Sequence, residues 1–276
     1  MEKEIKLINK VKRLIRRTGL PRWLHHFGPK KYEFLHHAIA YLIKQECKLG
    51  YRRVTRLLRW LGIKCPCYSA ICMSFHKLSL QIWQRLLKAT TNNLVNLVAI
   101  DGSGMSRPLP SPYFCMRIDK PYPIEIPLKL SIAVDTKRKK ILALRFRARK
   151  ANDIRDSRYL INRLPSKPNK LVADKGYDAE WLHQFCFDKG IKAVIPARDY
   201  GEMHGFTLRR KCAEHFNNKV YHRREMIESV FSAIKRKFGP SVSSVVFSAQ
   251  RAEMYCRAIA HNIFLFLYDF LNGACL

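Results

Sequence analysis

Two short apolar runs that each end in an aspartate constrain the fold of this chain more than any other feature. The runs are residues 93–100, followed by Asp101, and residues 170–173, followed by Asp174. Short apolar runs bounded by turn-forming residues are typical of buried strands. The glycines just after both aspartates predict loops at these points. Each strand is therefore expected to carry a carboxylate to its end.

Three further strand patterns accompany these runs. Residues 124–134 and 140–147 alternate between polar and apolar side chains about a turn at 135–139, which predicts an antiparallel hairpin. The expected strands thus span residues 93–100, 124–134, 140–147, 170–173 and 191–195. Helices are expected after Asn152, which we predict to cap the first of them, and over residues 179–189.

Three antiparallel strands followed by helix, strand, helix and strand are the order of a ribonuclease H-like α/β domain with a mixed five-stranded sheet. In that arrangement the first and fourth strands are parallel neighbours, so Asp101 and Asp174 are expected to lie side by side. Residues 1–92 read instead as helices joined by short Gly and Pro breaks. We therefore predict an all-helical N-terminal domain at 1–92 and an α/β domain at 93–276.

A helical segment after the predicted sheet carries a polar stripe beside an apolar face. At 3.6 residues per turn, Tyr221, Arg224, Glu228 and Lys235 fall within roughly 60° of arc. The residues of the apolar arc are Ile227, Val230, Phe231, Ile234 and Phe238. The Glu228 carboxylate suits a metal ligand, and the phenol, guanidinium and ammonium of the same stripe suit the binding of a phosphate beside that metal. The alternative is an exposed helix with one i,i+4 ion pair, worth about 0.3 kcal/mol.

In the ribonuclease H-like order, the helix of Glu228 crosses over Asp101 and Asp174. Three carboxylates brought together repel one another unless divalent cations bridge them. Their expected use is a two-metal site, with ions about 3.5–4 Å apart, that activates the attacking and leaving oxygens of a phosphodiester. Magnesium is the expected ion because it is hard and binds oxygen ligands, and manganese is a possible substitute.

The charge of the chain points to a polyanionic partner. Its 52 Lys and Arg against 21 Asp and Glu give a net charge of +31, which favours nucleic acid. Nine cysteines, an odd number without paired spacing, predict free thiols in a reducing cytoplasm. The apolar segment 259–271 is shorter than the roughly 20 residues that a bilayer requires, so we expect a buried closing helix and no membrane partner.

Residues 51–63 and 68–77 have the length and the intervening turn of a helix-turn-helix, with Ser69 as a candidate cap of the second helix. The arginines that could hold DNA phosphates beside it are Arg52, Arg53, Arg56 and Arg59. A helical hairpin without a ligand is the alternative. Four residues within this segment are candidate zinc ligands: Cys65, Cys67, Cys72 and His76. Their spacing is unusual for zinc, and small buried side chains explain the cysteines equally well.

Together, three motifs resemble those of bacterial and archaeal insertion-sequence transposases of the DDE class, over residues 94–270. The motifs are Ala99-Ile-Asp101-Gly-Ser, Ala173-Asp174-Lys-Gly-Tyr-Asp and Tyr221-x2-Arg224-x3-Glu228-x6-Lys235. The resemblance implies cut-and-paste transposition: binding of terminal inverted repeats, metal-dependent endonuclease cleavage, and strand transfer to a target, by a homodimer on double-stranded DNA.

The resemblance also implies residue roles. Asp101, Asp174 and Glu228 match the metal-binding catalytic triad, and Tyr221, Arg224 and Lys235 match the accessory residues that position the phosphate. Only 54 residues separate Asp174 from Glu228, too few for the large β-rich insertion of some members. The sequence therefore leaves open whether cleavage passes through a hairpin at the DNA end.

Two other functions remain open at this point. One is a catalytically silent or domesticated DNA-binding protein, and the other is a structure-specific nuclease of the same fold. The remaining carboxylates have structural explanations: a turn for Asp135, a helix first turn for Asp153 and Asp156, and a helix cap for Asp178. Tyr177 and Arg198 lie near predicted strand ends, where they could contact DNA.

Overall fold

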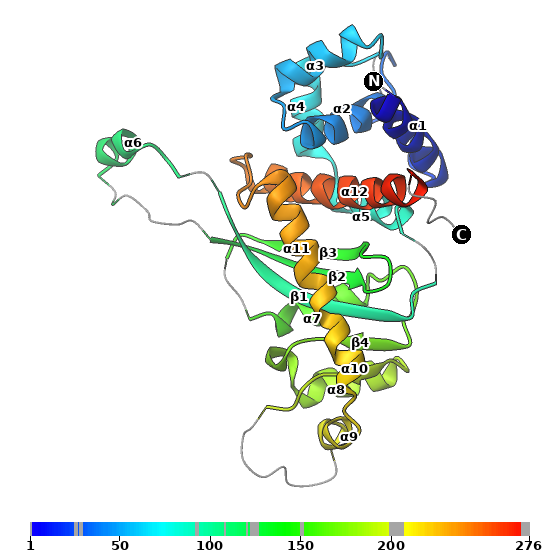
Figure 1. Ribbon diagram of the computed structural model, residues 1–276. Coiled ribbons are helices and arrows are strands. Elements are labelled where there is room, and N and C mark those ends of the chain that lie inside the picture. Colours follow the sequence, from blue (N-terminus) through cyan, green and yellow to red (C-terminus); the bar gives the residue numbers. More distant parts are fainter. Residues whose placement is uncertain are drawn as a thin grey trace. The chain divides into compact units, whose positions relative to one another are not determined.

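The computed structural model describes residues 2–24, 27, 30–91, 94–107, 109–119, 121, 127–149, 152–198 and 207–271. The chain divides into two compact units, Met1–Thr90 with Ser244–Leu276, and Thr91–Ser243 (Figure 1). The boundary after Thr90 lies close to the predicted boundary at residue 92. The boundary after Ser243 was not expected, because the residues that follow it join the N-terminal helices rather than the α/β unit.

The first unit is entirely helical in its described part. Its helices are α1 (Glu2–Arg17), α2 (Phe34–Glu46), α3 (Tyr51–Trp60), α4 (Tyr68–Lys77), α5 (Leu80–Ala89) and α12 (Phe247–Leu271). α12 packs against α2, α4 and α5 because most of its described side chains from Ala249 to Ile263 are buried. No described helix is both long enough and apolar enough to span a membrane.

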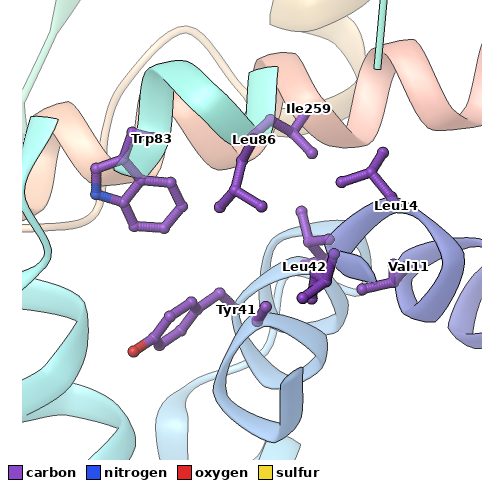
Figure 2. A pocket seen from close by; sticks show the side chains of 9 residues that line it. Val11, Leu14, Tyr41, Leu42, Trp83, Leu86 and Ile259 are labelled. Atoms are coloured by element: carbon purple, nitrogen blue, oxygen red, sulfur yellow. The ribbon is translucent and has the colours of Figure 1, made fainter. Parts of the chain in front are cut away.

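The core of this unit is apolar and aromatic. The rings of Tyr41, Phe75 and Trp83 pack edge-on or tilted, with centroids 5.0–5.9 Å apart. Figure 2 shows side chains from four helices converging beside them. The labelled residues are Val11, Leu14, Tyr41, Leu42, Trp83, Leu86 and Ile259. This packing ties the last helix of the chain to the first ones.

The second unit contains a mixed sheet. Its strands are β1 (Leu97–Ser106), β2 (Pro127–Asp135), β3 (Ile141–Arg147), β4 (Lys170–Val172) and β5 (Lys192–Val194), in the order β3-β2-β1-β4-β5. β1 is antiparallel to β2 and parallel to β4, as expected from the sequence. Residues 124–126, predicted as the start of the second strand, lie outside the described residues. The expected ribonuclease H-like fold is confirmed.

β1 is longer than predicted. The loop expected after Asp101 is instead a continuation of the strand, paired with β2 from Val98 opposite Asp135 to Ser106 opposite Pro127. Pairing with β2 gives the backbone N–H and C=O groups of this part of β1 hydrogen-bond partners, so the strand continues through both glycines. The pairing with β4 covers only residues 97–99. Asp101 therefore projects from the part of β1 where β4 has already ended.

The helices of this unit are α6 (Pro112–Arg117), α7 (Ile154–Ile161), α8 (Glu180–Asp188), α9 (Leu208–Glu214), α10 (Asn218–Tyr221) and α11 (Glu225–Phe238). α11 lies across the sheet and packs on β1 and β2 (Figure 1). Its buried side chains are the predicted apolar arc, Ile227, Val230, Phe231, Ile234 and Phe238. The segment before it differs from the single expected helix, because α10 ends at Tyr221 and a 3₁₀ turn spans His222–Arg224.

Candidate active site

The two aspartates follow the paired residues of β1 and β4. β1 and β4 pair with Ala99 opposite Val172, and two residues further along each chain are Asp101 and Asp174. Side chains two residues apart on a strand point to the same side of the sheet. The predicted side-by-side placement of the two carboxylates is therefore consistent with the strand pairing.

Arg224 joins the first aspartate to the glutamate on the helix. Its Nη1 lies 3.2 Å from Oδ2 of Asp101, and its Nη2 lies 2.5 Å from Oε1 of Glu228. The ion pair expected within the helix is thus present, but its arginine also reaches β1. The site is not a solvated helix surface, because the side chain of Asp101 is only 17% exposed and that of Arg224 only 20%.

Burial dominates the electrostatics of Asp101. Burial raises the pKa of Asp101 from 3.8 to about 6, against the opposing effects of the Gly102 N–H and the Arg224 guanidinium. The carboxylates of Asp174 and Asp153 raise this pKa further, which indicates that both lie nearby. Burial is the largest single effect on Arg224 and lowers its pKa, but the hydrogen bond and charge of Glu228, with the charges of Tyr221 and Asp101, together raise this pKa above its ordinary value.

Asp174 begins a 3₁₀ turn, Lys175–Tyr177, and its carboxylate accepts a hydrogen bond from the Gly176 N–H. Arg198 holds the same turn from outside. Its Nε donates to the Lys175 carbonyl at 2.7 Å and its Nη2 to the Gly176 carbonyl at 2.8 Å. In the structure the Arg198 guanidinium binds the turn that carries Asp174, and its contact with DNA stays a prediction.

Asp178 supports this clamp. Its carboxylate accepts hydrogen bonds from the Arg198 backbone N–H at 2.6 Å and from Arg209 Nε at 2.6 Å, and it lies 3.1 Å from His183 Nε2. Its predicted role as a helix cap is wrong, because Ala179 occupies the N-cap position of α8 and Asp178 is a buried centre joining three segments.

Tyr177 is not available to DNA, because it is only 1% exposed within the core of the sheet. Burial raises the pKa of Tyr177, and the carboxylates of Asp153 and Asp101 raise it further, so its hydroxyl stays neutral. Among the described residues, this hydroxyl has no hydrogen-bond partner.

The other candidate carboxylates have structural contacts. Asp135 accepts from the Lys137 N–H in the hairpin turn, as expected. Asp156 is buried beneath Arg145 and Arg147, and it accepts from the Ser131 hydroxyl at 2.7 Å. Asp153, rather than Asn152, occupies the N-cap position of α7.

The position of Asp153 accounts for the glycine at residue 102. Its carboxylate forms an ion pair with Lys129 and lies so close to Gly102 that a Cβ at this position would overlap it. A larger residue immediately after Asp101 would therefore displace the Asp153 and Lys129 side chains.

The lysine of the motif reaches the same strand. Lys235 Nζ donates to the Ser103 hydroxyl at 2.8 Å, across from α11 to β1. An open groove runs between these two elements. It is lined by Asp101, Gly102, Ser103, Glu228, Phe231, Ser232, Lys235, Arg236 and Pro240. Sequence reasoning missed Ser103, although its position two residues after Asp101 places it on the same face of an extended strand.

Tyr221 lies at the end of α10, where its ring packs against Phe216 with centroids 5.4 Å apart. It is also near Arg224, because the charge of Tyr221 raises the pKa of that guanidinium, after the larger effect of Glu228 and against burial. The placement of all four motif residues along one helical stripe stays a prediction, since a 3₁₀ turn separates Tyr221 from α11.

The donor set suits a hard cation, since Asp101, Asp174 and Glu228 offer carboxylate oxygens. Within the described part of the chain, however, no three His, Cys, Asp or Glu side chains stand together as a group that could hold a metal. Arg224 instead supplies positive charge to Asp101 and Glu228. In this structure Arg224 therefore occupies one oxygen of each of two candidate cation ligands.

The N-terminal candidates lie in the first unit. Arg52, Arg53, Arg56 and Arg59 are all exposed on α3, and Arg52 stacks over the Tyr68 ring of α4 at 5.0 Å. Ser69 is not the cap of α4, because Cys67 occupies that position. Cys72 lies 3.9 Å from His76 Nε2, and Cys67 contacts the Ser69 hydroxyl at 3.3 Å. No zinc-binding group of three ligands forms among the described residues.

Comparisons with known proteins find the same fold in DNA transposases. A family model described as the transposase DDE domain matches residues 97–263, more than half of the chain. A piggyBac transposase synaptic complex with hairpin DNA is similar over 98% of this chain and 73% of that chain, with a TM-score of 0.50 and 10% identity. This match supports the fold alone.

Two other solved structures are less similar. The Drosophila P element transposase strand transfer complex matches 90% of this chain and 67% of that chain, with a TM-score of 0.35 and 11% identity. The Mos1 strand transfer complex matches 88% of this chain and 78% of that chain, with a TM-score of 0.32 and 13% identity. A comparison with curated proteins finds no match. On its motifs, its fold and the family model, the chain belongs to the DDE transposase family.

Proposed function

We propose that this chain is an insertion-sequence transposase that binds terminal inverted repeats, cleaves DNA at their ends and joins the freed 3′ ends to a target. The observation that carries the proposal is the joint binding of Asp101 and Glu228 by one guanidinium, beside the neighbouring Asp174 turn. Family membership and the net charge of +31 support it.

Asp101, Asp174 and Glu228 are the proposed catalytic residues and the proposed ligands of two magnesium ions, for which manganese could substitute. Such ions, when bound, activate the attacking and leaving oxygens of the phosphodiester. In cleavage, a water oxygen bonds to phosphorus and the 3′ oxygen leaves. In joining, the freed 3′ hydroxyl oxygen bonds to a target phosphorus and loses its proton, and the 3′ oxygen of the target strand leaves and takes up a proton, so one site performs both displacements.

The neighbouring cations hold the DNA. Arg224, once it exchanges a carboxylate for phosphate oxygens, offers a planar fork that can bind two of them. Tyr221 and Lys235 extend this binding along the helix. The exposed arginines of α3 (Arg52, Arg53, Arg56 and Arg59) are proposed to contact the backbone of the terminal repeat. We propose a homodimer on DNA, because joining both ends of an element requires holding two of them.

The test is incubation of the purified chain with magnesium and labelled DNA carrying the inverted repeats that flank its gene. Cleavage confined to repeat ends, with joining to a plasmid, supports a transposase. Cleavage of branched DNA without regard to the repeats indicates a nuclease, and binding without cleavage indicates a catalytically silent protein. The Asp174→Ala variant should bind DNA but not cleave it. Loss of DNA binding in this variant would contradict its assigned role.

A further inference from the structure

The face of the sheet opposite α11 is covered by α7 and α8. Asp101 lies on the α11 side, where Arg224, the N-cap residue of α11, binds it. The next residue, Gly102, pairs with Ser131 of β2, whose hydroxyl donates to Asp156 of α7 at 2.7 Å. Because successive side chains of a strand point to opposite faces, α7 lies on the other face of the sheet from the candidate active site. α8 shares one buried core with α7 on that face.

The outer surface of α7 is basic. Its exposed charged side chains are Arg155 and Arg158, and Arg163 follows the helix. Asp156, the acidic residue of this helix, is fully buried against the sheet. Among the described side chains, none of these three arginines forms an ion pair. Arg155 and Arg158 are three residues apart, a spacing at which like charges on a helix repel each other. An anion bound across both would relieve this repulsion.

Aromatic rings hold two of these arginines in place. Arg158 Cζ lies 4.7 Å from the centroid of the Trp181 ring and 5.4 Å from that of the Phe185 ring, both on α8. Arg163 Cζ lies 3.6 Å from the centroid of the Tyr159 ring. A guanidinium over a ring keeps its charge, and its N–H donors can bind a second partner. The rings therefore preorganise both arginines without neutralising them.

Two exposed lysines extend this basic surface to the end of α8. Lys189 Nζ lies 5.1 Å from the centroid of the Phe185 ring. Lys167 reaches Gly190, where an added Cβ would lie 2.6 Å from its Nζ. The cations and rings together form what we call the α7–α8 patch: Arg155, Arg158, Arg163, Lys167 and Lys189, with Tyr159, Trp181 and Phe185.

The acidic residues of α8 leave this patch basic. The Glu180 carboxylate accepts hydrogen bonds from the Leu208 and Arg209 backbone N–H groups, so it serves the start of α9. Asp188 is exposed and accepts from the Gln184 amide at 2.7 Å. Five cations beside one such carboxylate suit a polyanion with regularly spaced charges, which is what a nucleic acid backbone offers.

We propose that the α7–α8 patch is a second DNA-binding surface, which holds duplex DNA by its phosphates without regard to sequence. A duplex fits better than a single strand, because arginines lie over the rings on which unpaired bases would stack. The patch lies on the other face of the sheet from Asp101, so it holds a different stretch of DNA from the scissile one. This inference rests on the proposed function only in taking duplex DNA as the partner. Such a surface keeps the chain on DNA that contains no terminal repeat.

The test measures the binding of a short random-sequence duplex that contains no terminal repeat. Dissociation constants are determined without metal, over a range of salt concentrations, for the intact chain, Arg158→Gln, Arg163→Gln and the double variant. Each lost phosphate contact should reduce the slope of log affinity against log salt by about 0.9 and weaken binding roughly 5- to 10-fold near 0.1 M salt. The double variant should lose about twice that slope. Arg158→Lys keeps the charge and should keep most of the slope.

Arg210→Gln is the matched control, because Arg210 is an exposed arginine of the same unit that pairs with Glu214 of α9, outside the patch. It removes the same formal charge but should change the affinity less than twofold. The proposal is overturned if Arg158→Gln and Arg163→Gln leave affinity and salt slope unchanged, or if they weaken the binding of duplex RNA but not of duplex DNA. Neither a repeat nor a metal is present, so these outcomes are distinct from a failure of repeat cleavage, which would count against the proposed function.

Discussion

At the scale of single residues, Asp101 is placed at a cost to stability. A carboxylate that is 17% exposed and lies near two others is held charged only with the help of Arg224 and the Gly102 N–H. Because its folded pKa of about 6 exceeds its ordinary value of 3.8, the folded state favours the protonated form. The free energy of unfolding therefore falls as pH rises through this interval.

Asp101→Asn should consequently stabilise the protein at pH 8, by about 1–3 kcal/mol, while abolishing cleavage. The gain should disappear below about pH 4, where the wild-type carboxyl is protonated as well. Urea unfolding across this pH range measures both values. Asp188→Asn, at an exposed carboxylate of α8, is the control and should change stability by less than about 0.5 kcal/mol. A destabilised Asp101→Asn at pH 8 would contradict the electrostatic assignment.

At the scale of elements, the turn after β4 depends on a clamp from a later segment. Arg198 binds two carbonyls of the turn, and Asp178 connects it to Arg209 near the start of α9. Ordinary fluctuation of such a short turn would move the Asp174 carboxylate. The clamp therefore couples the position of a proposed metal ligand to contacts made more than 20 residues away along the sequence.

Arg198→Ala should raise the magnesium concentration for half-maximal cleavage about 10- to 100-fold, with little change in DNA affinity. Arg198→Lys should need nearly as much magnesium for half-maximal cleavage as Arg198→Ala, because an ammonium cannot replace the planar fork that binds both carbonyls. Lys175→Ala removes a charge from the same turn but leaves its carbonyl in place, so it is the matched control. If Arg198→Ala instead weakened DNA binding and left the magnesium dependence unchanged, the arginine would be a DNA contact.

α12 carries a buried ion pair. Arg257 Nη2 lies 2.6 Å from Glu253 Oε1, with side chains 4% and 1% exposed. Glu253→Ala should lower the free energy of unfolding of the helical unit by about 3–5 kcal/mol, because it removes the carboxylate that a buried guanidinium binds and that accepts hydrogen bonds from Ser244. The double change Glu253→Leu, Arg257→Met should recover most of this loss.

Thermal and urea unfolding measure these values. Glu214→Ala breaks the exposed pair with Arg210, in which both side chains are 52% exposed, and should cost less than about 1 kcal/mol. Equal losses for Glu253→Ala and Glu214→Ala would show that the buried pair is not structurally important.

At the scale of the whole molecule, periodicity and motif spacing predicted the sheet, the α11 face and the alignment of Asp101 with Asp174. These features follow from local patterns. The continuation of β1 to Ser106 depends on pairing with β2, which no local pattern records. The clamp by Arg198 likewise depends on contacts distant in sequence. An apolar helix such as α12 does not encode which core it joins, so its packing with the N-terminal helices was not predicted.

The central claim is that Asp101, Asp174 and Glu228 together bind the catalytic cations. Crystals grown with manganese, measured for anomalous scattering, test it most directly. We expect anomalous peaks in contact with all three carboxylates, with Arg224 released from at least one of them. Absence of manganese from these side chains, with Arg224 still bound to both Asp101 and Glu228 at saturating metal, would contradict it.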